Sequence, residues 1–306
     1  MSKNPSFYLD NPDALSSVLS RLQLTAEVYS NGDFCGAWAV DTSGSRRIPF
    51  HLIGRGEAWL HTEGRPAQML SAGDLVLFPR DNQHIIAGSS EVPEEHMINA
   101  AVDEIEGPYT NMVCGFFEFQ SRAAWPLLDS LSDVIVMDLS DMSMSSTIRA
   151  LVDLMISELN RRAPGYHSVI NQLAYLLFVE VLRQQIELGQ VDSGLLTALF
   201  DPKISRALCA IHNHPARRWT LESLAGEAVM GRSSFARQFN ELTGVPPMQY
   251  LTAWRMQEAK GLLETSALSL GQIAEQCGYE SETAFRKAFK KVVGVPPGEV
   301  RRAAAR

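Results

Sequence analysis

An internal repeat near the C-terminus constrains this chain more than any other feature of its sequence. The stretch FARQFNELTGVPP at residues 235–247 returns 50 residues later as FRKAFKKVVGVPP at residues 285–297. A period of this length can belong to a solenoid, but two copies are too few to stack into one. The repeat therefore predicts two matched small helical units.

Each copy has the apolar spacing of an amphipathic helix. At about 100° per residue, one stripe of each helix is apolar. The stripe consists of Phe235, Phe239 and Leu242 in the first copy and of Phe285, Phe289 and Val292 in the second. Gly244 and Gly294 can adopt the left-handed conformation that ends a helix, and the Pro pair after each glycine prevents its continuation. Both copies are therefore predicted to be helices that end at these glycines.

A shorter helix is predicted before each of these longer ones. The short helices are residues 221–228 and 270–277, and residues 248–264 are predicted as one connecting helix. Thr220 and Ser269 stand where an N-cap is expected, and Ser269 with Gln272 fits a capping box. Gly231 and Gly278 mark the turns. A short helix, a tight turn and a longer helix make a helix-turn-helix, here present twice.

Polar and basic side chains occupy the faces that point away from the two Phe stripes. They are Ser233, Arg237 and Asn240 in the first long helix and Thr283, Arg286, Lys287 and Lys290 in the second. An Arg near the start of such a helix can bond a guanine edge through two hydrogen bonds, and hydroxyls and Lys suit phosphates. One copy alone fits an ordinary solvated face equally well, but two copies joined by one helix favour DNA reading.

Many dispersed positions in this region fit one family at once. WTLESLA at residues 219–225, SSF at 233–235, GVPPMQYL at 244–251, GYES at 278–281 and FRKAF at 285–289 together resemble the AraC/XylS family of bacterial transcription regulators. The resemblance covers roughly the last hundred residues. It implies base-reading positions at Ser233, Ala236 and Arg237, beside Ser234, and at Thr283, Arg286 and Lys287. Ala236 stands where relatives often carry a longer polar side chain, so reading by the first unit is expected to rest mainly on Arg237.

The charge distribution agrees with a nucleic-acid module at the C-terminus. From Asp201 to Arg306 there are 15 Lys and Arg against 10 Asp and Glu, whereas the whole chain carries 27 against 35. The net charge is therefore +5 for this part and −13 for residues 1–200. Opposite signs suit a DNA-binding module fused to a part that does not touch DNA.

The first half of the chain has the pattern of a small all-β domain. After a predicted helix at residues 13–22, short apolar runs alternate with Gly, Asp and Pro. The predicted strands are residues 35–40, 49–53, 58–61, 68–70, 75–78, 84–87 and 112–119. Glu63-Gly64 is a hairpin signal between two of them. Many short strands at this spacing are typical of a barrel or jelly roll.

Three motifs in this half resemble the cupin barrel. GDLVLFP at residues 73–79, followed by Asp81 and His84, resembles the second cupin signature, with Asp81 in place of the usual Gly. FHLIGRGE at residues 50–57 and VCG at 113–115 resemble the sensory cupin of one AraC-type subgroup. The resemblance makes His51 and His84 candidate ligand-binding residues, with a structural role for His84 as the alternative.

Cupins that hold iron, manganese or zinc suggest an enzyme as the alternative. A competent metal site needs three or four ligands, and Arg46 and Arg47 lie where the His-x-His motif is expected. We therefore predict no metal, no cofactor and no catalytic residue. Cys35 and Cys114 are candidates for redox sensing, although a buried Cys more commonly acts as a small apolar residue.

The remaining segments are predicted to be helical. Residues 142–162 and 169–188 form two amphipathic helices that cover the barrel, make a dimer contact, or both. Gly189–Gly194 is the expected linker, and residues 202–212 the first helix after it. The predicted fold is α+β. Residues 1–194 form a cupin-like β-barrel with a helical pair, and residues 195–306 form an all-α domain of two helix-turn-helix units joined by a long helix.

The combined interpretation is a sequence-specific bacterial transcription regulator whose cupin-like domain senses a small molecule or a redox signal. The alternatives are a metal-dependent cupin enzyme with an accessory DNA-binding domain and an architectural DNA binder without an effector. Expected partners are a double-stranded DNA operator, a small-molecule effector, a second copy of the chain and RNA polymerase. A cytoplasmic protein without membrane contact is expected, because the sequence lacks a signal peptide and long apolar runs, and its four Cys have no framework spacing.

Overall fold

The computed structural model describes residues 13–22, 24–100, 109–119, 125–139, 146–191 and 194–304, which form two compact units. The first unit contains residues 24–119 and 131–191 with the gaps just given, and it carries the β-strands. The second unit is helical and combines residues 194–304 with two earlier segments, residues 13–22 and 125–130. The helical unit therefore draws on three separate parts of the chain.

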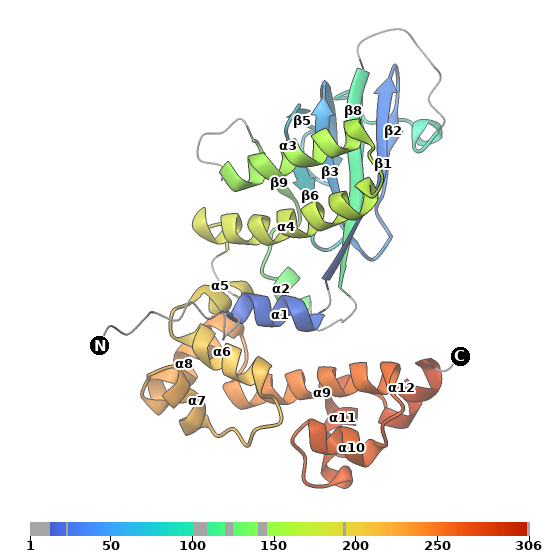
Figure 1. Cartoon of the computed structure of the whole chain (residues 1–306). Coiled ribbons are helices and arrows are strands. Elements are labelled where there is room, and N and C mark those ends of the chain that lie inside the picture. The colour runs from blue at the N-terminus through green and yellow to red at the C-terminus, as the bar shows by residue number, and fades with distance from the viewer. Residues whose placement is uncertain are drawn as a thin grey trace. The chain divides into compact units, whose positions relative to one another are not determined.

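Two antiparallel sheets make up the first unit (Figure 1). The larger sheet has the strand order β1 (Leu24–Cys35), β8 (Tyr109–Phe119), β3 (Ile48–Arg55), β6 (Leu75–Leu77) and β9 (Ile135–Met137). The smaller sheet has the order β2 (Ala39–Val40), β7 (His84–Ala87), β4 (Glu57–Thr62) and β5 (Gln68–Ser71), and a single 3₁₀ turn, η1 (Glu95–Met97), follows it in the chain. No strand pairing among the described residues joins the two sheets, so the observed arrangement is two sheets and not a closed barrel.

Both sheets contribute to one apolar core. The larger sheet supplies Ile53, Val76 and Met112, and the smaller sheet supplies Leu60, Leu70 and Ile86, all buried in the same cluster. Successive side chains of a strand point to opposite faces, so each sheet turns one face toward this shared core. The two sheets therefore face each other.

Most predicted strands are confirmed, and two assignments are wrong. The hairpin at Glu63-Gly64 joins β4 to β5, with Gly64 at φ 71°. The predicted strand 35–40 is interrupted, because Gly36 has φ 69° and separates β1 from β2. The segment from residue 120 to 200 is not all helical, since β9 lies in it and pairs with β6. Three residues are too few for an alternating pattern to be seen in the sequence.

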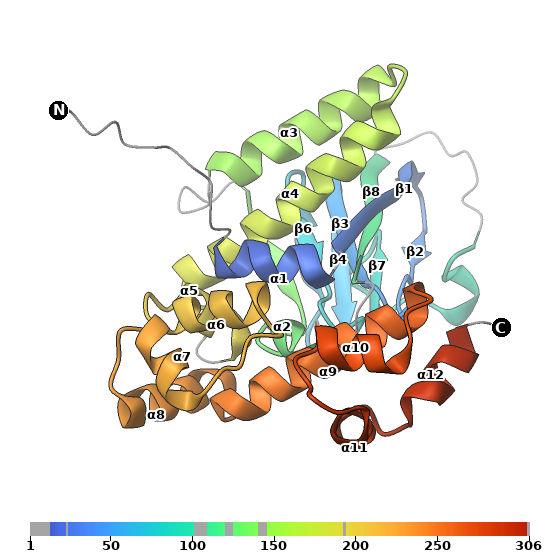
Figure 2. The ribbon, with the colours of Figure 1, turned by 60° about the horizontal axis from the view of Figure 1, so that its bottom comes forward.

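Two long helices cover the larger sheet. They are α3 (Ser146–Arg161) and α4 (Tyr166–Glu187), which run side by side over the sheet in Figures 1 and 2. Asn171 of α4 accepts a hydrogen bond from the backbone N–H of Val28 at 3.1 Å, and Phe178 lies 4.7 Å from Phe117 of β8 between ring centroids. Of the two roles expected for this pair, the structure shows packing on the larger sheet, and the dimer contact stays a prediction. Residues 140–145, part of the predicted first helix, lie outside the described residues.

The helical unit has ten helices among the described residues. They are α1 (Ala14–Leu22), α2 (Trp125–Leu128), α5 (Leu195–Phe200), α6 (Ile204–Asn213), α7 (Leu221–Glu227), α8 (Arg232–Thr243), α9 (Pro247–Thr265), α10 (Leu270–Gln276), α11 (Glu282–Val293) and α12 (Pro297–Ala304). Helix α5 was not predicted, so the predicted helix at residues 202–212 is not the first one after the linker. No helix in the described parts of the chain is long and apolar enough to cross a membrane.

The predicted helix ends are confirmed with one exception. Thr220 and Ser269 are N-caps with capping boxes, and Gly244 and Gly294 end α8 and α11 with φ values of 75° and 88°. Gly231, expected to form the first tight turn, has an ordinary φ of −68°. The left-handed residue of that turn is instead Val229, with φ 52°. A β-branched residue is rare in this conformation, so nothing in the sequence indicated it.

The connecting helix α9 belongs to two cores. Tyr250 in its first half packs 5.6 Å from Phe239 of α8 between ring centroids. Met256, Ala259 and Leu263 in its second half share a buried cluster with Phe285 and Phe289 of α11. The first half of α9 thus completes the pair α7–α8 and the second half completes the pair α10–α11. Figure 1 shows the two pairs at opposite ends of α9.

The segment before β1 packs with the helical unit. Helix α1 buries Leu15, Val18 and Leu19, and its Ser17 hydroxyl donates to Asn213 Oδ1 of α6 at 3.2 Å. In the predicted linker, Asp192 and Ser193 lie outside the described residues, whereas the N–H of Gly194 donates to the carbonyl of Leu242 at 2.8 Å. The predicted boundary at residue 194 stays a prediction.

Candidate nucleic-acid interface and buried histidine cluster

The first candidate surface is the outer face of α8. Phe235 and Phe239 are fully buried, so the opposite face of the helix is turned to solvent. The predicted contact residues there are Ser233, Ser234, Arg237 and Asn240, which are exposed, and Ala236, which is half-buried. The Arg237 side chain is 76% exposed and lies 3.9 Å from Glu241 Oε1. A single surface pair at this distance holds the guanidinium weakly, so it can reorient toward a ligand.

The second candidate surface is the corresponding face of α11. Phe285 and Phe289 are fully buried, and the predicted contact residues Thr283, Arg286, Lys287 and Lys290 are all exposed. Arg286 donates through Nε to Glu282 Oε1 at 2.8 Å, and its Nη2 lies 2.6 Å from the same oxygen. Arg286 is therefore held more firmly than Arg237, by a carboxylate one turn earlier in the same helix.

A cluster of polar side chains lies buried inside the sheet unit. His51, His84 and Cys114 are each at most 2% exposed. The Thr42 hydroxyl lies 3.1 Å from Nε2 of His51 and 2.9 Å from Nε2 of His84, and the two Nε2 atoms are 3.4 Å apart. On the other side of its ring, Nδ1 of His51 lies 3.2 Å from Sγ of Cys114. The structure thus brings together the two predicted ligand-binding histidines and one predicted redox cysteine.

The hydrogen-bond directions in this cluster can be assigned by starting from the backbone carbonyl of Asn82, which can only accept a hydrogen bond. Nδ1 of His84 lies 2.7 Å from the carbonyl oxygen of Asn82, so this nitrogen carries the proton. In a neutral ring Nε2 of His84 then accepts from the Thr42 hydroxyl, and the Thr42 oxygen accepts from Nε2–H of His51. Nδ1 of His51 is left to accept from the thiol of Cys114. The assignment satisfies every member with both rings neutral.

Burial keeps the cluster uncharged. Desolvation, followed by the neighbouring His84, lowers the pKa of His51 to about 3, and desolvation also lowers the pKa of His84. Burial raises the pKa of the Cys114 thiol to about 12. The thiolate is the reactive form of cysteine, so Cys114 lacks the lowered pKa of a redox-sensing thiol.

The two redox candidates lie far apart along one strand pair. Cys35 is opposite Tyr109 in the register of β1 and β8, whereas Cys114 is opposite Ser30. Five residues along β1 separate these positions, which is about 17 Å at the usual rise of a strand. A disulfide needs Cα atoms within about 7 Å, so Cys35 and Cys114 are not positioned to form one. The four cysteines of the chain all lie in its described parts, and none of them forms a disulfide there.

The turn before the cluster depends on an unusual aspartate. Asp81, which stands where the cupin signature has Gly, adopts φ 55°. Its carboxylate accepts from the backbone N–H of Arg46 at 2.5 Å and from the Ser45 hydroxyl at 3.4 Å. Asp tolerates the left-handed conformation better than most residues, because its short side chain can bond locally. Asp81 can therefore hold the left-handed turn at the position where the cupin signature has glycine.

Two family models match the chain. One, described as Cupin, matches residues 13–187, and one described as Helix-turn-helix domain matches residues 224–303. An AraC-like transcription regulator of Streptomyces lividans is 31% identical over 299 residues, which cover 95% of this chain and 98% of that protein. The chain belongs to the AraC-type family of helix-turn-helix transcription regulators.

One further relative and one solved structure are also similar to this chain. The HTH-type transcriptional regulator AlkR of Acinetobacter baylyi is 32% identical over 295 residues, covering 91% of this chain and 95% of that protein. The DNA-binding domain of AdpA, solved in complex with a target DNA, is 36% identical with a TM-score of 0.32, over 34% of this chain and 92% of that one. Because its relatives over nearly the whole length are named as regulators, this AraC-type protein is a DNA-binding transcription regulator and not an enzyme.

Several residues of this regulator's candidate sites were missed by sequence reasoning. Glu241 and Glu282 could have been found from their spacing of four residues to Arg237 and Arg286. Thr42 carried no signal, because its place in the cluster depends on how the strands pack. Among the described residues no group of three or more His, Cys, Asp or Glu side chains is arranged to hold a metal ion.

Proposed function

We propose that this regulator places α8 and α11 in successive major-groove segments of one operator, and that the buried histidine cluster belongs to the site that receives its signal. The observation that carries the first part is the repeat of an exposed hydroxyl-rich and basic face on two helices joined by α9. Helix α9 has 19 residues, about 28 Å of length at the usual rise. Major-groove segments on one side of DNA recur at about 34 Å.

The side chains on these faces divide into two roles in this proposal. Arg237, with no strong partner, makes a bidentate contact to a guanine, helped by Ser233 and Asn240. Ser234 and Lys290 bind phosphates. Arg286, Thr283 and Lys287 read the second segment, whereas Ala236 offers only a methyl contact.

The test of this proposal is a footprint. Duplexes are selected from a random pool by the purified full-length protein, and the selected duplex is then probed by hydroxyl-radical cleavage. We expect two protected segments about 10 base pairs apart on one side of the helix. Protection of a single segment, or no enrichment of any sequence, would contradict the proposal.

For the sensory part, we propose that the two facing sheets enclose a cupin-like effector site at Thr42, His51 and His84. A small uncharged molecule that replaces the hydrogen bonds within the cluster would find both donors and acceptors there, on two neutral imidazoles and a hydroxyl. The raised pKa of Cys114 supports a small-molecule effector over oxidation of this thiol.

His84→Ala tests the sensory proposal. Small molecules are screened for those that raise the unfolding temperature of the wild type. An effector bound at the cluster should stabilise the wild type and change its DNA affinity, and should do neither in His84→Ala. A molecule that acts equally on both proteins would place the sensory site elsewhere.

The remaining parts of the proposal concern assembly and organisation. Leu154 of α3 with Val169 and Leu176 of α4 are apolar and exposed, which supports a homodimer formed through these helices. A domain boundary near residue 194, a cytoplasmic location and a contact with RNA polymerase complete the proposal, and the last rests on family membership alone.

A further inference from the structure

The two helix-turn-helix pairs meet through one arginine of α9. Arg255 donates through Nε to the carbonyl of Pro215 at 2.7 Å and through Nη2 to the carbonyl of Arg217 at 2.8 Å. Both carbonyls lie in the loop before α7, which we call the α6–α7 loop (residues 214–220). The same guanidinium lies 5.8 Å from the ring centroid of Tyr279. Tyr279 is in the turn of the second pair, and only Glu280 and Ser281 separate it from α11. One side chain therefore contacts both pairs.

The turn of the second pair approaches this loop so closely that it has no room for a side chain. Gly278 has φ 77°, and a Cβ there would lie 2.6 Å from the carbonyl oxygen of Ala216 and 2.8 Å from Nη2 of Arg255. Real Cβ atoms do not come that close to other heavy atoms, so any other residue would push the loop and the turn apart. The contact between the two pairs thus has two components, the donors of Arg255 and the close approach at Gly278.

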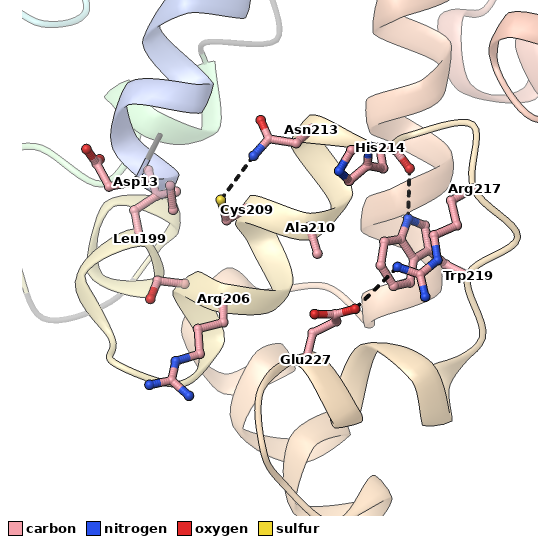
Figure 3. Close-up of a pocket in the computed structure, with 12 residues that line it drawn as sticks. Asp13, Leu199, Arg206, Cys209, Ala210, Asn213, His214, Arg217, Trp219 and Glu227 are labelled. Atoms are coloured by element: carbon pink, nitrogen blue, oxygen red, sulfur yellow. Dashed lines mark hydrogen bonds and ion pairs between the residues drawn. The ribbon is translucent and has the colours of Figure 1, made fainter. Parts of the chain in front are cut away.

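The α6–α7 loop is also held by contacts within the first pair. Nε1 of Trp219 donates to the carbonyl of His214 at 2.9 Å, and the Arg217 guanidinium lies 4.1 Å from the centroid of the Trp219 ring (Figure 3). Arg217 also pairs with Glu227 at the end of α7 at 3.4 Å. Because the loop is tied to the first pair in this way, a bond from Arg255 to the loop transmits the position of the first pair.

We propose that Arg255 is a positioning residue that sets the angle between α8 and α11, and so the spacing of operator segments that the protein accepts. The inference rests on the proposed two-segment reading of DNA. The planar guanidinium suits this task, because it directs two donors at two carbonyls in a fixed geometry that a lysine ammonium does not reproduce. Two charge-assisted hydrogen bonds at a half-buried site also stabilise a contact more than one ion pair on the surface does.

A nearby ion pair is the weaker candidate for the same role. Arg218 of the α6–α7 loop pairs with Glu280, but these side chains are 84% and 76% exposed. Pairs so exposed contribute little, because water and salt screen them. Arg218→Met therefore serves as the matched control for Arg255→Met, since both remove one arginine from the contact between the pairs.

The first experiment measures the distance between the pairs in the full-length protein. Nitroxide labels are placed on unnatural side chains at Gly226 of α7 and Lys291 of α11, both exposed, so that the native cysteines stay in place. Electron–electron resonance should give a narrow distance distribution for the wild type and for Arg218→Met. Arg255→Met should broaden it. An unchanged distribution in folded Arg255→Met would overturn the proposal.

A second variant keeps the test decisive if Arg255→Met does not fold. Gly278→Ala retains Arg255 but inserts a methyl group where the loop lies, so it should shift the distance between the labels. Gly231→Ala is the control, because a Cβ at that turn residue meets nothing within 4 Å and its φ is −68°. A shift in Gly278→Ala alone supports the proposal. Equal results in both variants, or no shift in either, would overturn it.

The DNA arm of the test uses the duplex that the wild type selects from a random pool. Loss of the fixed angle removes the advantage of simultaneous binding, so Arg255→Met should bind this duplex about tenfold more weakly. Binding to a duplex with one segment scrambled should be unchanged. Inserting one base pair between the segments should weaken the wild type more than the variant. If the wild type selects no duplex, the two-segment function fails, while the distance measurement still decides the role of Arg255.

Discussion

The two helix-turn-helix pairs have the same buried framework but differ at their turns. Val229 and Gly278 occupy the corresponding left-handed position, and the N–H of the next residue donates to an alanine carbonyl at 2.9 Å in both turns. Val229 is 71% exposed, whereas the space beside Gly278 is filled by the α6–α7 loop and Arg255. The backbone conformation is thus the same in both turns. The α6–α7 loop beside the second turn leaves no room for a side chain, whereas the first turn is open to solvent.

The starts of the two recognition helices differ as well. The N-cap of α11 is Ser281, whose side chain accepts from the N–H of Ala284 at 3.2 Å, whereas the N-cap of α8 is Gly231, which has no side chain to accept such a bond. A serine cap stabilises a helix more than glycine does, by a few tenths of a kcal/mol. Glu282 also adds a favourable negative charge to the first turn of α11. The first turn of α11 is therefore more strongly stabilised than the first turn of α8.

The largest expected effect concerns whether the two pairs unfold separately. Phe235→Ala and Phe285→Ala each remove a fully buried ring and should each cost about 3–5 kcal/mol of stability. Because α9 contributes different residues to each core, we expect each variant to affect its own pair. Hydrogen exchange should show lost protection in α7–α8 for the first variant and in α10–α11 for the second.

The double variant sharpens this comparison. If the cores are independent, the two losses in unfolding free energy should add within about 0.5 kcal/mol. Loss of protection throughout both pairs in either single variant would show instead that the pairs and α9 unfold as one cooperative body.

The second prediction compares sequence reading between the pairs. Arg237→Ala should weaken binding to the selected duplex by about 1–3 kcal/mol and relax preference at one base position. Lys290→Ala should weaken binding to selected and scrambled duplexes alike and reduce the salt dependence by about one unit of slope. Titrations of both duplexes at several salt concentrations make the measurement. If Arg237→Ala weakened both duplexes equally, the assignment of base reading to the first pair would be wrong.

The third prediction uses the second pair as an internal reference. Residues 266–304 contain no histidine, whereas the sheet unit contains His51, whose pKa is lowered to about 3 by burial. Between about pH 6.5 and pH 3 the unfolded chain binds a proton at His51 that the folded chain does not. Stability of the sheet unit is therefore complete above about pH 6.5 and falls on acidification, by up to about 1.4 kcal/mol per pH unit for this group.

Hydrogen exchange at pH 7 and pH 5 measures this effect in one sample. Protection in β3 and β8 should fall more than protection in α10–α11. His51→Gln should reduce the difference, because glutamine does not titrate. An equal loss in both regions would show that the acid effect does not originate at His51.

The framework of the helical unit was predictable from the sequence because each signal is local. Phe285, Phe289 and Gly294 lie within one helix, and their spacing alone indicates a buried stripe and a helix end. Ser269 and Gln272 form a capping box, which their residue types and their spacing of three residues are enough to indicate. Such features do not depend on where the rest of the chain lies.

The contacts between distant segments could not be predicted in this way. Arg255 bonds carbonyl groups about forty residues away, and backbone carbonyls look alike in any sequence. Thr42 joins His51 and His84 only because three separate segments pack together. The place of α1 with the helical unit is of the same kind, since its apolar stripe indicates a partner but not which one. The two histidines were found because a motif, not periodicity, marked them.

The smallest expected effect tests the first turn directly. A β-branched residue in the left-handed conformation costs about 1–2 kcal/mol, and Val229→Gly removes this cost. Glycine makes the unfolded chain more flexible, which offsets about 0.5–1 kcal/mol of the gain. The net expectation is a stabilisation of up to about 1.5 kcal/mol, measured by denaturant unfolding of the full chain. Gly278→Val is the reciprocal change and should be destabilising, because it adds the strain that Val229 carries and also collides with Ala216. If the two changes had equal and opposite effects, backbone strain alone would distinguish the turns, and the close approach of the loop to Gly278 would contribute nothing.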